Sequence, residues 1–135
     1  MNAEKVLIDR SVWIAYFRND SNDLTEQVEQ LMTGSEICVP RIVIAELIQG
    51  SKSEREISVI LSFMGAFTII DQTEETWSKA GRLAYDLKKK GRNVNLADCY
   101  IATIAQEQGC RVYTLDEHFK DIQKIIRISL LQKTR

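Results

Sequence analysis

Four carboxylates lie at positions from which acids can gather at one site: Asp9, Glu46, Asp98 and Asp116. Asp9 and Asp116 come just after short apolar runs, Glu46 lies inside an apolar segment, and Asp98 opens another one. Gathered acids of this kind suit hard cations such as Mg²⁺ and Mn²⁺, which prefer oxygen ligands. Such a cation would activate water and offset the charge that builds on a phosphate during hydrolysis. Whether the four acids meet depends on the elements that carry them.

Each acid also has a structural interpretation. Asp9 and Asp116 are at positions typical of turn or helix-capping residues. Asp98 lies three residues after Asn95, as in a capping box. Glu46 is surrounded by so many apolar residues that we expect it to be partly buried. A buried carboxylate needs a cation, a metal or hydrogen bonds, so Glu46 is satisfied by one of these unless it occupies a single solvated position.

Alternating strands and helices are expected to position these acids. Apolar and β-branched runs predict strands at residues 6–8, 37–39, 67–70 and 111–114, and a last strand near 126–131. Periodicity and capping residues predict helices from a cap at Ser11, over 23–33, from Pro40 to about 50, from a cap at Ser53 to about 64, from a cap at Thr73 to 90, over 95–108, and around Phe119. Strands separated by helices imply a parallel α/β sheet, here in one domain spanning residues 1–135.

The parallel sheet predicts where the acids meet. Ligands of open parallel sheets bind outside the carboxyl ends of the strands, where the strand order reverses. Asp9 and Asp116 each follow a strand and are therefore expected at the same edge of the sheet. Asp98 begins a helix of small and apolar residues, so its first turn is expected to pack near that edge.

Composition narrows the class of protein. With 44% hydrophobic and 27% charged residues, the chain is typical of a globular protein. Its net charge of -1 gives no bulk attraction to nucleic acid, so any such contact must come from a local basic patch. Cys38, Cys99 and Cys110 form no CxxC pair and are expected to be reduced core residues. The stretch before Asp9 is too short for a signal peptide or a membrane span, which predicts a cytosolic protein.

The chain has a single histidine, His118. Ribonuclease mechanisms in which the RNA 2′-hydroxyl attacks typically rely on histidines as acid and base. One histidine makes that route a poor match, and a lone exposed His is expected to be structural. If the chain cuts RNA, hydrolysis with a metal-activated water would therefore suit it better than attack by the 2′-hydroxyl.

The motifs around the acids resemble a known family. The segments that carry the resemblance are residues 9–14 (Asp-Arg-Ser-Val-Trp-Ile), 44–47 with Gly50, 96–102, and 112–116 with Phe119. They are similar to the motifs of PIN-domain ribonuclease toxins of the VapC type. The resemblance implies a three-layer α/β/α fold with a central parallel sheet, and a cytosolic, homodimeric endoribonuclease held inactive by a cognate VapB-type antitoxin. It also implies a Mg²⁺ or Mn²⁺ site made of Asp9, Glu46, Asp98 and Asp116, with Ser11 and Thr114 as polar neighbours.

Arg10 departs from the family pattern, which commonly has a small hydroxyl residue there. A cation at this position would either bind the scissile phosphate, or pair with Asp9 or Asp116 and compete with the metal. Two other functions stay open. One is a catalytically weakened or silent RNA- or protein-binding module. The other is a phosphotransfer enzyme with Asp9 as nucleophile, although such enzymes usually have a second Asp where this chain has Ser11.

Overall fold

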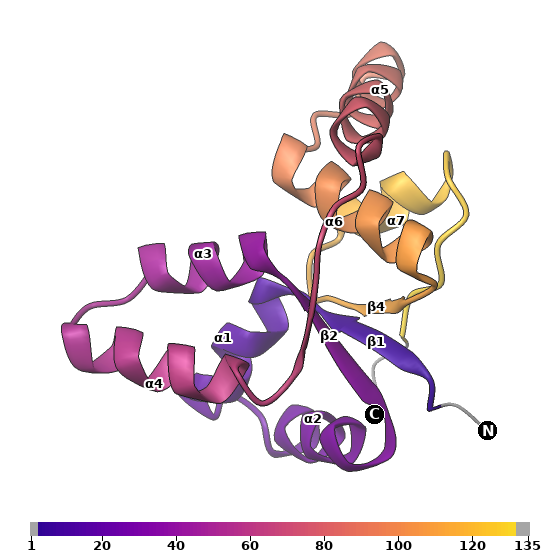
Figure 1. The fold of residues 1–135 in the computed structure, drawn as a ribbon. Coiled ribbons are helices and arrows are strands. Elements are labelled where there is room, and N and C mark those ends of the chain that lie inside the picture. The colour runs from indigo at the N-terminus through magenta and orange to yellow at the C-terminus, as the bar shows by residue number, and fades with distance from the viewer. Residues whose placement is uncertain (1–2, 132–135) are drawn as a thin grey trace.

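A parallel sheet lies at the centre of the structure, a computed structural model that describes residues 3–131 (Figure 1). Within that range its strands are β1 (Lys5–Ile8), β2 (Glu36–Pro40), β3 (Thr68–Ile70) and β4 (Arg111–Tyr113), in the order β3-β2-β1-β4. Val6 of β1 pairs with Ile37 of β2 on one side and with Arg111 of β4 on the other. Residues of β1 and β2 are buried on both faces, which explains their continuous apolar sequences. The expected parallel sheet is confirmed.

Helices cover both faces of this sheet. The described residues form α1 (Arg10–Arg18), α2 (Asn22–Gly34), α3 (Arg41–Gln49), α4 (Glu54–Met64), α5 (Thr76–Lys89), α6 (Leu96–Gln108) and α7 (His118–Gln123). In Figure 1, α5, α6 and α7 gather on one side of the sheet and α1 and α2 on the other, while α3 and α4 form a neighbouring pair beside β2. The three-layer α/β/α fold implied by the sequence is therefore confirmed.

Helix α6 forms the centre of one helical layer. It packs against α5, α7 and β4, and every residue from Asp98 to Ala105 is buried. A helix that is apolar on all sides is stable only when other elements surround it. Because Asp98 lies in the first turn of this helix, packing of the core carries its carboxylate into the interior.

The capping predictions are partly right. Ser53 and Asn95 cap α4 and α6 as expected. The Ser53 hydroxyl accepts the backbone N–H of Glu56 at 3.1 Å, and the Asn95 side chain accepts the backbone N–H of Asp98 at 2.8 Å. Ser11 is not a cap, because α1 begins at Arg10, before Ser11, and the cap position belongs to Asp9. The predicted start of α5 at Thr73 is also wrong. The backbone N–H of Thr73 donates to the Thr76 hydroxyl in a turn that precedes the helix.

The predicted last strand near residues 126–131 is wrong. Within residues 3–131, this segment contributes a single parallel bridge, which joins Leu130 to Val112 of β4. Val112 donates its N–H to the carbonyl of Ser129 and accepts the N–H of Leu131, both at 2.8 Å. The alternation of Ile126, Ile128 and Leu130 imitates a strand, but β4 is only three residues long and offers few backbone groups for pairing.

Two expectations from composition can be compared with the structure. Cys38, Cys99 and Cys110 are buried free thiols, as predicted. Among residues 3–131, none of the helices combines the length and apolar character needed to span a membrane.

Candidate metal centre

The site lies at the carboxyl ends of β1 and β4. The chain moves outward from β1 to β2 and β3, and then crosses to the other side of β1 to form β4. The strand order therefore reverses between β1 and β4, which is where ligands of such sheets bind. Asp9 follows β1 directly, and its N–H donates to the carbonyl of Tyr113 at the end of β4, at 3.0 Å. Asp116 follows β4 three residues later, so the expected meeting of the two acids at one edge is confirmed.

Hydroxyl groups hold Asp9 in place. Asp9 is 4% exposed, and its Oδ2 accepts hydrogen bonds from Ser11 Oγ at 3.0 Å and Thr114 Oγ1 at 2.8 Å. The same two hydroxyls accept backbone N–H groups from the loop after β4, Leu115 at 3.0 Å and Asp116 at 3.0 Å. Ser11 and Thr114 thus fasten the end of β1 to the loop that carries Asp116, and they orient both acids.

Asp98 is the most perturbed carboxylate of the group. Its backbone N–H is capped by Asn95, so the capping role and the place in the site coexist. The side chain is buried, and Oδ2 has no hydrogen-bond partner among the described residues. Burial, followed by the negative charges of Asp116 and Asp9, raises the pKa of Asp98 to about 7. An ionised Asp98 therefore has no hydrogen-bond donor at Oδ2 within residues 3–131, and the nearest group that could offset its charge is His118, whose Nδ1 lies 3.8 Å away.

Glu46 approaches the same group of acids from α3. Its side chain is one quarter exposed, and its buried Oε1 accepts no hydrogen bond from the described residues. Burial raises the pKa of Glu46, the charge of Arg10 opposes that shift, and the charge of Asp9 adds to it. The expected partial burial of Glu46 is confirmed, and of the three kinds of partner expected for it, a cation, Arg10, lies nearby.

Arg10 does not pair as the sequence suggested. Its Nε lies 4.0 Å from Glu46 Oε2, and among residues 3–131 it forms no ion pair with Asp9 or Asp116. The pairing arises because α1 and α3 pack against each other, which brings residues 36 positions apart into contact. Arg10 is half exposed and therefore lies at the rim of the site.

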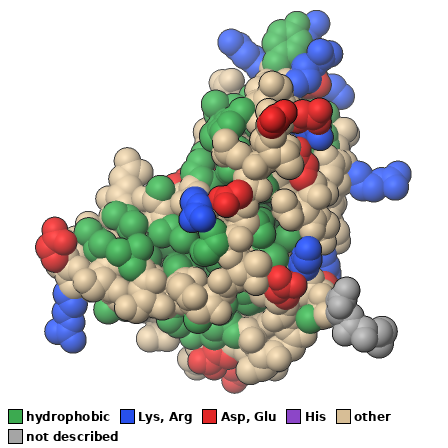
Figure 2. All heavy atoms as spheres, viewed as in Figure 1, with side chains coloured by type: hydrophobic (Ala, Val, Ile, Leu, Met, Phe, Trp, Pro, Cys, Tyr) green, Lys and Arg blue, Asp and Glu red, His purple; other side chains and the backbone are tan. Residues whose placement is uncertain are grey.

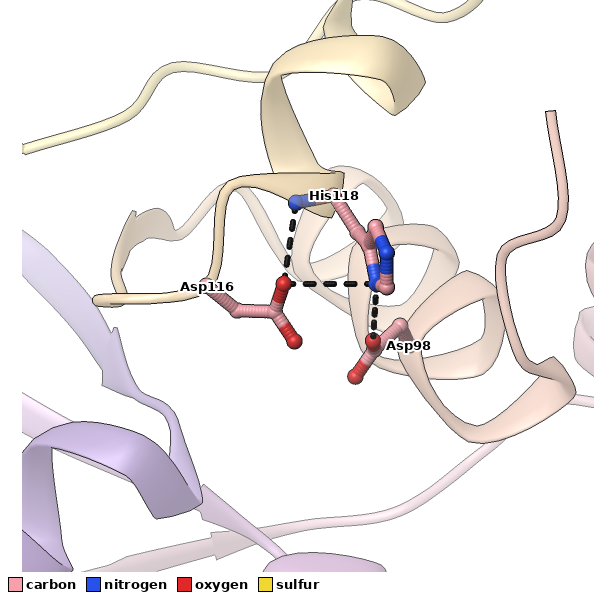
Figure 3. A group of neighbouring side chains, drawn as sticks. All are labelled: Asp98, Asp116 and His118. Atoms are coloured by element: carbon pink, nitrogen blue, oxygen red, sulfur yellow. Dashed lines mark hydrogen bonds and ion pairs between the residues drawn. The ribbon is translucent and has the colours of Figure 1, made fainter.

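His118 completes the site in a way that the sequence did not predict. Its Nδ1 lies 3.3 Å from Asp116 Oδ1 and 3.8 Å from Asp98 Oδ2 (Figure 3). Its backbone N–H also donates to Asp116 Oδ1, at 2.9 Å. This local hydrogen bond turns the chain so that the imidazole faces the two acids. The available signal was the spacing, because an Asp two residues before another residue commonly accepts that residue's N–H in a tight turn.

The residues fit a divalent cation. Ligand atoms of Asp98, Asp116 and His118 all lie within 4.8 Å of one another, whereas Asp9 and Glu46 border this group. Two buried carboxylate oxygens, Asp98 Oδ2 and Glu46 Oε1, lack partners among the described residues. Buried carboxylate oxygens without a hydrogen-bond donor are costly, and a bound cation would satisfy them. Oxygen-rich donor sets of this kind suit Mg²⁺ and Mn²⁺.

A parallel sheet covered on both faces, with acids at its switch point, defines a PIN-like class of α/β/α domain. The family model described as "PIN domain" matches residues 6–125, and the chain belongs to the PIN domain family.

Comparisons with individual proteins point to one group within that family. The chain is 23% identical over 128 residues to Ribonuclease VapC2 of Haemophilus influenzae, covering 92% of this chain and 94% of that protein. It is 29% identical over 121 residues to Ribonuclease VapC1 of Methanocaldococcus jannaschii, covering 89% and 82% respectively. The solved structure of VapBC-1 from nontypeable Haemophilus influenzae matches with a TM-score of 0.77 at 25% identity, over 97% of this chain and 99% of that one. The resemblance to VapC proteins drawn from the motifs is therefore confirmed.

Proposed function

We propose that this chain is an endoribonuclease that hydrolyses RNA phosphodiester bonds with Mg²⁺ or Mn²⁺ held by Asp9, Asp98 and Asp116, with Glu46 beside them. One observation carries the proposal: acids from four separate segments converge at the switch point, and two of them keep a buried oxygen without a partner among residues 3–131. The names of the VapC relatives, which describe ribonucleases, support the same reaction.

Each residue of the site would have its own role in the hydrolysis of RNA. When bound, the cation supplies the activated water and the positive charge that phosphodiester hydrolysis requires. Ser11 and Thr114 occupy Oδ2 of Asp9, and its Oδ1 accepts no hydrogen bond from the described residues. Asp98 Oδ2, which is buried and has no hydrogen-bond partner among residues 3–131, would be one of the oxygens that hold the cation. Arg10 at the rim can contact a phosphate of the RNA.

The test is cleavage of purified total RNA by the full chain with Mg²⁺, with Mn²⁺ and in EDTA, followed by mapping of new 5′ ends. We expect discrete cuts that require the metal and disappear in Asp98→Asn. Asp71→Asn is the matched control, because Asp71 also follows a strand but is exposed, pairs with Arg41 at 2.9 Å and is not among the charges that shift the pKa of Glu46 or Asp98. Cleavage that persists in EDTA, or in Asp98→Asn, would refute the proposal.

We also propose that the chain is the toxin of a toxin-antitoxin pair, acting in the cytosol as a homodimer and inhibited by a VapB-type protein. The VapBC complexes among its structural neighbours support a protein partner. Figure 2 shows apolar side chains at the surface over α3 and α4, and surface apolar patches favour protein contacts. Two residues of α4, Val59 and Leu61, are about half exposed. Expression of the chain should arrest growth, and Asp98→Asn should not. Light scattering of the purified protein would test the dimer.

A silent binding module is the second candidate, because Arg10 beside Glu46 supplies a positive charge near the proposed metal position. Calorimetric titration with Mn²⁺ separates the two functions. Saturable binding that disappears in Asp98→Asn supports the nuclease, whereas RNA binding without metal binding supports the silent module.

A further inference from the structure

His118 lies where a ligand of the proposed cation would lie. Figure 3 shows its imidazole edge facing the carboxylates of Asp98 and Asp116. The Nδ1 atom is 3.3 Å from Asp116 Oδ1 and 3.8 Å from Asp98 Oδ2. Half of the side chain is exposed to solvent, so the imidazole closes the outer side of the group and is not part of the core.

The separations between these three atoms suit a single small cation. Six ligands in an octahedron with bonds of about 2.1 Å place neighbouring ligand atoms about 3.0 Å apart and opposite ones about 4.2 Å apart. The two measured separations from Nδ1 lie between these values. Small side-chain rotations would therefore bring all three atoms to bonding distance of one ion.

A second observation points to a ligand at this position. Asp98 Oδ2, the atom that faces Nδ1, is buried and has no hydrogen-bond partner among residues 3–131. The side chain of Asp98 is 10% exposed, so water does not readily compensate it. The ring of His118 lies close to this oxygen, yet at 3.8 Å it is too far for a hydrogen bond. A cation between the two would satisfy both atoms.

We propose that His118 Nδ1 is a metal ligand together with Asp98 and Asp116, and that this nitrogen makes the site prefer Mn²⁺ and similar transition metals to Mg²⁺. Imidazole binds first-row transition metals well, whereas Mg²⁺ selects oxygen ligands and retains water. The inference rests on the proposed function only for the use of the metal in cleavage. Metal binding itself can be measured without RNA.

The competing role for His118 is that of a counter-cation which only neutralises the two acids. The two roles predict opposite effects of removing the ring. A ligand that is lost weakens metal binding, and weakens Mn²⁺ more than Mg²⁺. A counter-cation that is lost leaves more uncompensated negative charge, so binding of either metal stays the same or becomes tighter.

The experiment is calorimetric titration of the full chain with Mn²⁺ and separately with Mg²⁺, for the wild type, His118→Ala and His118→Gln. The backbone N–H that donates to Asp116 is kept in both variants, so the turn should persist. Lys120→Ala is the matched control, because it removes a positive charge from the same helix at a side chain that pairs with Glu117 and is 70% exposed. Circular dichroism establishes that each variant folds.

We expect both His118 variants to lose at least about ten-fold in Mn²⁺ affinity, by analogy with the loss of supporting groups around metal sites. Mg²⁺ affinity should change by less than about three-fold, since oxygen ligands and water dominate its shell. Pulsed electron paramagnetic resonance of the Mn²⁺-loaded wild type should show coupling to a ¹⁴N nucleus that both variants lack. Unchanged or tighter Mn²⁺ binding, equal losses for the two metals, or no nitrogen coupling would each overturn the inference.

The outcome is separable from that of the proposed function. Nitrogen-coupled Mn²⁺ binding without RNA cleavage would refute the nuclease and leave the ligand assignment intact. Metal-dependent cleavage without nitrogen coupling would do the reverse.

Discussion

Replacing Asp98 by Asn should stabilise the metal-free protein at alkaline pH while it abolishes cleavage. Burial and the charges of Asp116 and Asp9 raise the pKa of Asp98 from its ordinary value of 3.8 to about 7. Below about pH 4, folded and unfolded chains both carry the proton. Between about pH 4 and pH 7 only the folded chain carries it, so the stability of the wild type falls as the pH rises through this window. Above pH 7 the penalty is complete.

The size of this penalty follows from the pKa values. At about 1.36 kcal/mol per pH unit, a rise from 3.8 to about 7 corresponds to ~4 kcal/mol. Side chains and water around Asp98 can rearrange when it ionises, so we expect a measured difference of ~1–4 kcal/mol. Asn keeps the shape of the side chain, and Asn95 still caps the backbone N–H of residue 98. The increase in the free energy of unfolding should therefore appear only at pH values where Asp98 of the wild type is ionised.

Urea unfolding in EDTA at pH 4 and pH 8 measures this effect. Asp98→Asn should be more stable than the wild type at pH 8, and equal to it within about 0.5 kcal/mol at pH 4. Excess Mn²⁺ should stabilise the wild type and leave the variant unchanged. Asp71→Asn should shift stability by less than about 1 kcal/mol at either pH, because its ion pair is exposed. A variant that is less stable at pH 8, or whose effect is the same at both pH values, would refute the reasoning.

Three further substitutions test other parts of the structure. Thr114→Val removes a hydrogen bond to Asp9 and leaves a backbone N–H without its acceptor, so it should lower the free energy of unfolding by ~1–3 kcal/mol in urea titrations; no loss would show that the hydroxyl is dispensable. Arg10→Ser should tighten Mn²⁺ binding by about two- to five-fold in calorimetry, the range of a half-exposed ion pair, and weaker binding would mean that Arg10 supports the site. Burial alone would raise the pKa of Glu107. Hydrogen bonds from Thr76 and Lys79 outweigh the effect of burial and hold the pKa of Glu107 below its usual value. Glu107→Gln should therefore cost ~1 kcal/mol at pH 7, an effect that fades as the pH falls below about 4, and a loss of equal size at pH 3 would contradict this assignment.

Local signals in the sequence were enough for most of the fold. Residues 6–8 and 37–39 were correctly predicted as strands because they are continuous apolar runs. Both faces of β1 and β2 are covered, so polar residues do not alternate with apolar ones in these runs. Asn95 predicts the start of α6 correctly because capping depends on residues only three positions apart in the sequence. From these elements, the geometry of parallel sheets placed Asp9 and Asp116 at one edge.

The parts that the sequence did not predict depend on tertiary packing. Arg10 meets Glu46 only because α1 packs on α3, and no rule of local spacing relates positions 36 residues apart. The segment 126–131 has the alternation of a strand, but whether it pairs depends on how much of β4 remains available at the edge of the sheet. His118 was hidden for another reason, since a single exposed histidine carries no pattern that separates a ligand from a surface residue.

The burial of Asp98 connects the fold to the proposed chemistry. The apolar residues that make α6 the centre of its layer also carry Asp98 into a region where ionisation is unfavourable. Asn95 caps that first turn, which stabilises the helical backbone that carries the Asp98 side chain. Hydroxyls from Ser11 and Thr114 hold Asp9, and through the loop Asp116, against the same region. Because the core enforces this convergence of like charges, removing one of them should relieve the metal-free protein. A bound cation should relieve it without any loss of the acids, which is why stability and metal affinity are expected to change in opposite directions when Asp98 is replaced.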